Sequence, residues 1–268
     1  KPMNCYLWEQ TPGYRSEYGQ KAPFLVPYLC KDEEKRGAVI VLPGGGYEML
    51  AEHEGEPYAK MYRKNGFHAF VLHYRVAPYH YPEIIWDAQR AIRFVRANAE
   101  RFHVDPEKIA VCGSSAGGHL ALMTAEHFDG GDKTAADSIE RQSSRPDALI
   151  LCYPVVTLGR GTHLPSRNRL LRDCEDRAAL IRSLSGERAV RRDMPPVFVW
   201  TAANDRCVRP DNSLCLANAL QRAKVPYEFH LFSAGHHGVG LAKRFGNIAL
   251  WAPLSVDFLR LHFGQKEV

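Results

Sequence analysis

Short apolar runs alternate along the chain with longer stretches in which apolar residues recur at helical spacing. In residues 82–102 apolar side chains recur three or four positions apart, with Asp and Arg between them, which predicts an amphipathic helix covering a sheet. Further helices are expected after Ser115, at 213–224 and at 247–263. Runs rich in β-branched and aromatic residues predict strands at 37–42, 67–74, 108–112, 148–153 and 227–232, and in the run that begins at 197.

This alternation predicts an α/β fold with a mostly parallel central sheet and helices on both of its faces. Segments with candidate chemistry are spread from 43 to 237, so no division of the chain leaves a complete site on one side. We therefore expect one domain over 1–268. Residues 157–195 interrupt the alternation with a dense mixture of Arg and Asp, and we interpret them as a small helical cap. These charged residues either form a solvated surface or contact substrate, and the sequence does not decide between the two.

Composition narrows the class of protein. The net charge of +5 is modest and acids are interspersed with bases, so the charge pattern does not indicate nucleic-acid binding. No apolar stretch reaches the ~20 residues needed to cross a bilayer. The seven cysteines form no C-x-x-C pair, so we expect reduced thiols and a cytoplasmic location. Because the chain starts at Lys1 rather than Met, we expect a processed or truncated start, and the lack of a signal peptide carries little weight.

The pentapeptide at 113–117, Gly-Ser-Ser-Ala-Gly, lies between an apolar run and a helix-forming run. This context predicts a strand, a sharp turn and a helix with Ser115 at the apex, where a strained backbone exposes the hydroxyl. Gly113 and Gly117 remove side chains that would collide where the strand and the helix pass closely. Ser115 is therefore the candidate nucleophile.

A second motif, Pro-Gly-Gly-Gly-Tyr at 43–47, follows the predicted strand 37–42. Glycines at the carboxyl end of a strand let backbone N–H groups turn toward one point, as the oxyanion of a tetrahedral intermediate requires. For such a motif alone, a flexible glycine turn is the alternative. Its position one βαβ unit before the serine turn favours oxyanion donors at Gly45 and Gly46, with the N–H group of Ala116 as a further donor.

Two later segments supply an acid and a base. Asp205 follows the apolar run that begins at 197, and an acid on such a loop can point across the sheet edge toward a histidine. His236 and His237 follow the predicted strand 227–232 and are flanked by glycines. The chain order Ser, Asp, His is that of a triad on this class of fold, so we expect at least one of the two histidines to be catalytic. The histidines show no spacing typical of a metal site.

These motifs resemble those of the α/β-hydrolases, in particular the small acetylesterase and acetylxylan-esterase-like branch, near the feruloyl-esterase and hormone-sensitive-lipase-like groups. The similarity covers nearly the whole chain. In that family, Gly-x-His-Gly followed by an apolar residue aligns His237 with the catalytic base and places His236 at a variable position. Pro43 stands where lipase-like relatives carry His, which favours the sugar-esterase branch. The resemblance rests on the segments 43–47, 74–78, 87–93, 113–121 and 235–241.

The resemblance implies a serine hydrolase with the triad Ser115, His237 and Asp205. In this reaction the imidazole takes the Ser115 proton as the hydroxyl attacks an ester carbonyl, and neither a cofactor nor a metal is required. The expected partner is a small-molecule ester or an acetylated oligosaccharide, and we expect neither nucleic acid nor a membrane as a partner. The sequence is compatible with a homo-oligomer and does not fix the oligomeric state.

The expected substrates are short-chain acyl esters, above all acetyl esters of sugars or xylo-oligosaccharides. Tyr47 follows the oxyanion glycines, and Tyr74 and Arg75 close a neighbouring strand, so we expect these three to form the mouth of the site and bind substrate. Packing of the tyrosines under the loops is the alternative. An arylformamidase, a lipase-like or feruloyl esterase and a small serine peptidase are rival functions with the same fold and triad. A non-catalytic binding protein generally lacks a triad residue, whereas all three are present here.

Overall fold

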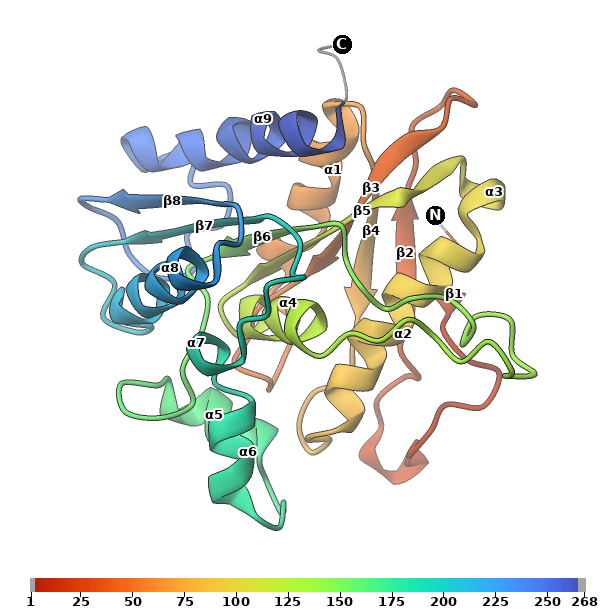
Figure 1. Ribbon diagram of the computed structural model, residues 1–268, viewed down its shortest axis with the longest axis horizontal. Coiled ribbons are helices and arrows are strands. Elements are labelled where there is room, and N and C mark those ends of the chain that lie inside the picture. Colours follow the sequence, from red (N-terminus) through yellow and green to blue (C-terminus); the bar gives the residue numbers. More distant parts are fainter. Residues whose placement is uncertain (1–2, 265–268) are drawn as a thin grey trace.

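The computed structural model describes residues 3–264 and contains one eight-stranded sheet in the order β1-β2-β4-β3-β5-β6-β7-β8 (Figure 1). The pairs β1–β2 and β2–β4 are antiparallel, and the other pairs are parallel. The expected mostly parallel sheet is therefore confirmed. The strands are β1 (Cys5–Tyr6), β2 (Phe24–Tyr28), β3 (Arg36–Leu42), β4 (His68–His73), β5 (Val104–Ser114), β6 (Ala148–Cys152), β7 (Val197–Ala202) and β8 (Tyr227–Phe232).

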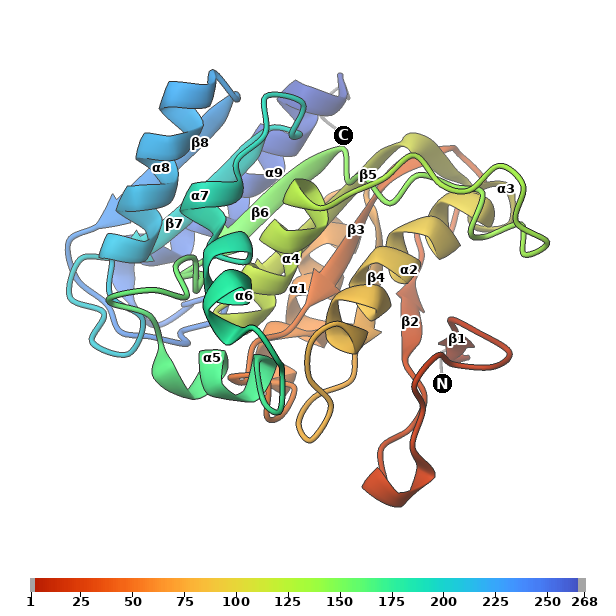
Figure 2. The same cartoon turned by 60° about the horizontal axis from the view of Figure 1, so that its bottom comes forward.

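Helices cover both faces of the sheet. Figures 1 and 2 show α1 and α9 on one face and α2, α4 and α8 on the other. The helices are α1 (Glu56–Lys64), α2 (Glu83–Ala97), α3 (Ala99–Phe102), α4 (Ala116–Glu126), α5 (Leu164–Leu170), α6 (Arg177–Ser183), α7 (Gly186–Ala189), α8 (Asp211–Ala223) and α9 (Trp251–Phe263), with 3-10 helices η1 (Ser16–Tyr18), η2 (Glu52–Glu54) and η3 (Gly246–Leu250).

The hydrophobic core has two layers because successive side chains of a buried strand point to opposite faces. In β3, Val39 and Val41 belong to the layer under α1 and α9. Ile40 and Leu42 belong to the layer under α2, α4 and α8. Both faces of this strand are buried, which explains its unbroken apolar sequence.

The predicted helix at 82–102 is interrupted in the structure. It consists of α2 and α3, which are separated at Asn98, whose side-chain amide donates a hydrogen bond to the Phe94 carbonyl at 2.8 Å. Sequence periodicity did not reveal β1, β2 or α1. The pattern in β2 is broken by Pro27, and a proline in a strand is typical of an edge or near-edge position.

Three short helices, α5, α6 and α7, lie between β6 and β7, within the segment 157–195. In Figure 1, α5 and α6 project below the sheet, and Figure 2 turns this lower side toward the viewer. All seven cysteines are free thiols. Within residues 3–264, no helix has both the length and the apolar character that a membrane span needs.

Candidate active site

Ser115 lies at the sharp turn between β5 and α4. Its backbone has φ 55° and ψ −119°. Residues other than glycine rarely adopt this conformation, so the surrounding structure must hold it in place. A Cβ atom on Gly113 would lie 2.1 Å from the Gly117 carbonyl oxygen, and one on Gly117 would lie 2.2 Å from the Leu42 carbonyl oxygen. Only glycine fits at either position, so this strained turn depends on both.

A chain of hydrogen bonds joins Ser115, His237 and Asp205. Ser115 Oγ lies 2.8 Å from His237 Nε2, and His237 Nδ1 lies 2.7 Å from Asp205 Oδ2. Asp205 is buried, and its Oδ1 accepts hydrogen bonds from the backbone N–H groups of Cys207 and Val208. Because the Nδ1–H group donates a hydrogen bond to the carboxylate, Nε2 is free to accept the serine proton. The arrangement can therefore activate the Ser115 hydroxyl.

The two adjacent histidines have different surroundings. His236 is exposed, its ring packs against Phe245 with a centroid distance of 4.7 Å, and its Nδ1 lies 2.9 Å from the His237 carbonyl oxygen. His237, and not His236, contacts Ser115. Within the described part of the chain, no cluster of three or more His, Cys, Asp or Glu side chains could hold a metal ion.

The glycine motif after β3 packs against the turn that carries Ser115. A Cβ atom on Gly44 would lie 3.1 Å from Ser115 Cβ, so the two segments are in contact. Among residues 3–264, the N–H groups of Gly45, Gly46 and Ala116 have no protein acceptor. The Ala116 N–H group is also at the N-terminus of α4, where the helix dipole favours negative charge. The three N–H groups that the sequence predicts as oxyanion donors therefore have no partner among the described residues.

The structure corrects the expectation that Tyr47 and Tyr74 contact substrate. Tyr47 is fully buried, and its hydroxyl lies 2.7 Å from His119 Nδ1 on α4. Tyr74 is also buried, and its hydroxyl donates a hydrogen bond to the Pro43 carbonyl. Both tyrosines support the loop 43–47 from inside the protein, which was the alternative interpretation. This loop is called the oxyanion loop below, after the role expected for its N–H groups.

Arg75 is buried as well, so its expected role in substrate binding is also wrong for this structure. Its guanidinium forms an ion pair with Asp87 on α2, with a shortest N–O distance of 2.7 Å, and donates to the Pro12 and Glu83 carbonyls. The Arg75 guanidinium therefore has its hydrogen-bond acceptors within the protein. Arg75 lies two residues after β4, and the strand pattern did not show that the N-terminal segment contacts it.

His119 links α4 to both the oxyanion loop and the segment after β6. Its Nε2–H group donates to the Leu184 carbonyl at 2.8 Å, so Nδ1 accepts a hydrogen bond from the Tyr47 hydroxyl. Burial lowers the pKa of His119 to about 4, which keeps the imidazole neutral in this role. The support for the oxyanion loop thus extends from Tyr47 to Leu184.

One residue that the sequence analysis did not single out, His163, lies beside the oxyanion loop. Its Cε1 atom would be 3.9 Å from a Cβ atom on Gly46. Its Nδ1 lies 2.7 Å from Ser166 Oγ, whereas Nε2 has no hydrogen-bond partner among residues 3–264. Burial lowers the pKa of His163, and the nearby His237 lowers it further, so the imidazole is neutral near pH 7. The sequence feature that could have pointed to His163 is that it is the single histidine in the expected cap, residues 157–195.

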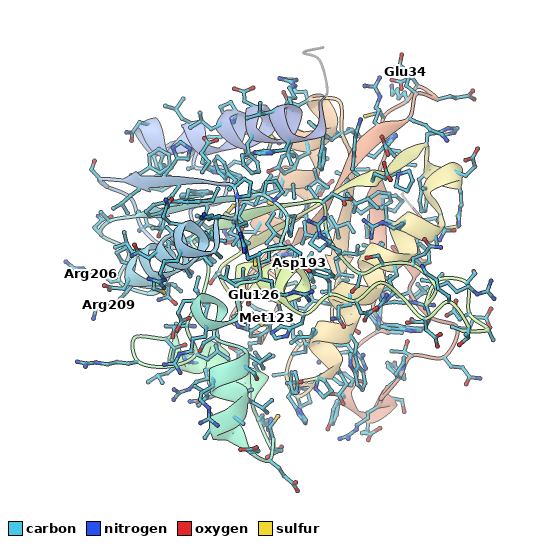
Figure 3. All side chains as sticks on the ribbon, viewed as in Figure 1. Glu34, Met123, Glu126, Asp193, Arg206 and Arg209 are labelled. Carbon is cyan, nitrogen blue, oxygen red and sulfur yellow. The ribbon has the colours of Figure 1, made fainter. Side chains whose placement is uncertain are left out.

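Arginine side chains near the site point either toward it or into solvent. Arg169 on α5 donates to the Gly46 carbonyl at 3.2 Å and pairs with Glu48 at 2.6 Å, so the segment after β6 contacts the oxyanion loop directly. Arg206 and Arg209, on the loop after β7, are exposed and point outward at the edge of the molecule (Figure 3). Of these three arginines, Arg169 is the one placed beside the site.

The chain is similar to known proteins over most of its length. It is 37% identical over 242 residues to endo-1,4-beta-xylanase B of Butyrivibrio fibrisolvens, an alignment that covers 88% of this chain and 38% of that protein. It is 29% identical over 226 residues to the acetylxylan esterase of Xylanibacter ruminicola, with coverages of 82% and 44%. The chain thus spans about two fifths of the length of these two relatives.

A solved structure and a family model agree with this similarity. The crystal structure of the acetyl ester-xyloside bifunctional hydrolase from Caldicellulosiruptor lactoaceticus has a TM-score of 0.95 and 40% identity, covering 99% of this chain and 97% of that one. The BD-FAE family model matches residues 27–220, a range that includes Ser115 and Asp205 and ends before His237. On this match, the chain belongs to the BD-FAE family of α/β-hydrolases.

Proposed function

We propose that this protein is a serine carboxylic-ester hydrolase that removes short acyl groups, above all acetyl, from sugars or xylo-oligosaccharides. The observation that carries the proposal is the hydrogen-bonded chain from Ser115 through His237 to Asp205. The free N–H groups of Gly45, Gly46 and Ala116 support it, because acyl transfer needs donors where negative charge develops on the carbonyl oxygen.

The reaction follows from this geometry in two stages. His237 Nε2 accepts the Ser115 proton as Oγ attacks the ester carbonyl carbon, and the free N–H groups hold the oxyanion. The imidazolium, oriented by Asp205, then gives its proton to the alcohol oxygen as the C–O bond breaks, which leaves an acyl-serine. Water attacks this ester with His237 again as the base, and the carboxylic acid departs with Ser115 restored.

We also propose that 1–268 is one domain and that 157–195 forms a cap over the site. His163 and Arg169 support this role, because both lie against Gly46. The helices α5, α6 and α7 contain seven, seven and four residues. A cap of such short helices offers no continuous apolar helix to enclose a long acyl chain, which favours short acyl groups.

An acetylated sugar as the substrate is supported by the chemistry of the cap and by the relatives. His163 Nε2 and the Arg169 guanidinium are polar groups suited to the hydroxyls of a sugar alcohol. Among the similar proteins, one is named an acetylxylan esterase and another an acetyl ester-xyloside hydrolase.

The test is a panel of p-nitrophenyl esters from acetate to decanoate, run beside acetylated xylo-oligosaccharides. We expect kcat/KM to be highest for acetate and to fall steeply as the acyl chain lengthens, with release of acetate from the oligosaccharides. A maximum at octanoate or longer would replace this proposal with a lipase-like function. Activity on feruloyl but not acetyl esters would indicate a feruloyl esterase. Preferred cleavage of formyl-kynurenine or aminoacyl-nitroanilides would indicate an arylformamidase or a peptidase.

A further inference from the structure

The segment Ala-Glu-His-Glu-Gly at 51–55 was not part of the predicted site, yet it lies between the two loops that form it. His53 Nε2 lies 2.7 Å from the carbonyl oxygen of Gly238, in the loop that follows His237. The adjacent Glu54, in η2, is only 3% exposed and contacts the oxyanion loop. Two neighbouring side chains therefore contact loops that are far apart in the sequence.

Glu54 holds the first glycine of the oxyanion loop. Its Oε2 accepts a hydrogen bond from the Gly44 N–H group at 2.8 Å. Gly44 lies directly against Ser115 and precedes Gly45, whose own N–H group is free. The carboxylate thus fixes the residue immediately before the proposed oxyanion donors.

The other oxygen of Glu54 is connected through Tyr153 to the loop 235–241, which carries His237 and is called the histidine loop. The Tyr153 hydroxyl donates to Glu54 Oε1 at 2.7 Å and accepts a hydrogen bond from the Gly240 N–H group at 3.1 Å. The Tyr153 ring packs against the His237 ring with a centroid distance of 4.9 Å. Its backbone φ of 35° is strained for tyrosine and has to be held by its surroundings.

The position of these donors explains why a carboxylate is kept in the interior. A buried carboxylate has lost its water and needs donors in its place. Here the donors are Gly44 and Tyr153, one on the oxyanion loop and one in contact with the histidine loop. Without the carboxylate, the Gly44 N–H group is left unpaired inside the protein. The Tyr153 hydroxyl keeps only the Tyr58 hydroxyl, 3.4 Å away, as an acceptor, and the connection between the loops is broken.

We propose that Glu54 is a positioning residue that couples the oxyanion loop to the histidine loop, an inference that rests on the proposed ester hydrolysis. Glu54 acts through Gly44 and Tyr153. A misplacement of about 1 Å at the reacting groups costs about 10²-fold in rate. The expected loss is in kcat, because the nucleophile, base and oxyanion donors must be aligned in the transition state.

The test compares Glu54→Ala, Glu54→Gln and wild type on p-nitrophenyl acetate, with Glu52→Gln as a matched control because Glu52 is exposed in the same 3-10 helix. Glu54→Ala should lower kcat about 10²-fold and leave KM within about twofold. Glu54→Gln keeps an acceptor for Gly44 and should lose less, and Glu52→Gln should match wild type. The inhibition constant of a trifluoromethyl ketone, whose adduct carries an oxyanion, should rise by the factor by which kcat falls.

A second variant and a second measurement separate this inference from the proposed function. Tyr153→Phe keeps the ring against His237, removes only the bridging hydroxyl, and should lower kcat about tenfold even if Glu54→Ala does not fold. Hydrogen exchange needs no activity: the peptides 43–47 and 235–241 should both exchange faster in Glu54→Gln and Tyr153→Phe than in Glu52→Gln.

Unchanged exchange in both peptides would overturn the coupling, whether or not any ester is hydrolysed. So would a loss of thermal stability with kcat and the inhibition constant unchanged, since that result assigns Glu54 a structural role alone. A wild-type protein that hydrolyses no ester would instead overturn the proposed function, and the exchange data would still decide the coupling.

Discussion

Two buried carboxyl groups lie near opposite ends of α4, and each belongs to a glutamate that is 3% exposed. At the N-terminal end, beside Ser115, Glu54 accepts hydrogen bonds from Gly44 and Tyr153. At the C-terminal end, Glu126 has neither carboxyl oxygen hydrogen-bonded within residues 3–264 (Figure 3). The two groups are equally buried and differ in their hydrogen-bond partners.

The difference teaches that burial alone does not identify a carboxylate with a role in the reaction. Burial raises the pKa of Glu126 well above its usual range, and the Glu187 carboxylate nearby raises it further. Glu126 therefore stays a neutral acid to higher pH than an exposed glutamate. Glu54 instead has donors from the structure around the site. In the proposed reaction the N-terminal end of α4 carries the chemistry, whereas Glu126 at the C-terminal end affects only stability.

The largest effect is expected at the N-terminal end, from Ser115→Ala. The variant lacks the nucleophile, so kcat should fall by as much as about 10⁶-fold, toward the detection limit, while circular dichroism shows an intact fold. Ser114→Ala is the local control, because the Ser114 hydroxyl donates to Tyr58 rather than to the histidine. It should keep most of its turnover. A Ser115→Ala protein with most of its activity would mean that the turn is not the reactive end of α4.

The next largest effect distinguishes the two adjacent histidines. His237→Ala removes the group that contacts both Ser115 and Asp205, so kcat should fall by at least about 10³-fold. His236→Ala removes an exposed ring that packs on Phe245 and should change mainly KM or thermal stability. Steady-state kinetics on p-nitrophenyl acetate measures both, and the opposite ranking would reassign the base.

A smaller effect is expected from the cap. His163→Ala removes an imidazole beside Gly46 whose Nε2 is free to bind a hydroxyl. The KM for acetylated xylo-oligosaccharides should rise about 3- to 10-fold, the loss expected for one hydrogen bond. The KM for p-nitrophenyl acetate, which has no sugar hydroxyls, is the comparison and should change little. Equal changes for both substrates would show that His163 does not contact the sugar.

The smallest effect on activity is expected at the other end of α4. Glu126→Gln should leave kcat unchanged and raise the free energy of unfolding at neutral pH. The folded state keeps a proton on Glu126 above pH 4.5, where the unfolded chain releases it, so stability is greatest below that pH and falls as the pH rises toward the folded-state pKa. The variant should lose this decline and gain a few degrees in Tm at pH 7, at roughly 2–4 °C per kcal/mol.

Thermal denaturation from pH 4 to 8 checks this prediction. Identical slopes of Tm against pH in the variant and wild type would show that Glu126 ionises normally. A loss of kcat in Glu126→Gln would remove the contrast between the two ends of α4.

Much of the fold and of the site could be predicted because the signals are local. The strained serine turn needs glycine at 113 and 117, which the sequence displays directly. Asp205 and His237 follow apolar runs whose carboxyl ends meet at one sheet edge, and the structure places both in contact as expected. These inferences need only strand patterns and chain order.

The remaining features depend on which segments touch, and the pattern of one chain does not show this. The contact of His53 with Gly238 joins positions 185 residues apart. Tyr47 and Arg75 were expected at the mouth because each ends or follows a strand, but α4 and the N-terminal segment bury them. His163 enters the site only because α5 packs against the oxyanion loop.

The most direct test of the central claim is covalent labelling with a fluorophosphonate, followed by mass spectrometry of the digested protein. We predict one adduct, on Ser115, that accumulates in step with the loss of p-nitrophenyl acetate hydrolysis and is absent from Ser115→Ala. Two results would contradict the account. One is a fully labelled protein that still hydrolyses p-nitrophenyl acetate at the unlabelled rate, and the other is an adduct on another residue that accounts for the loss of activity.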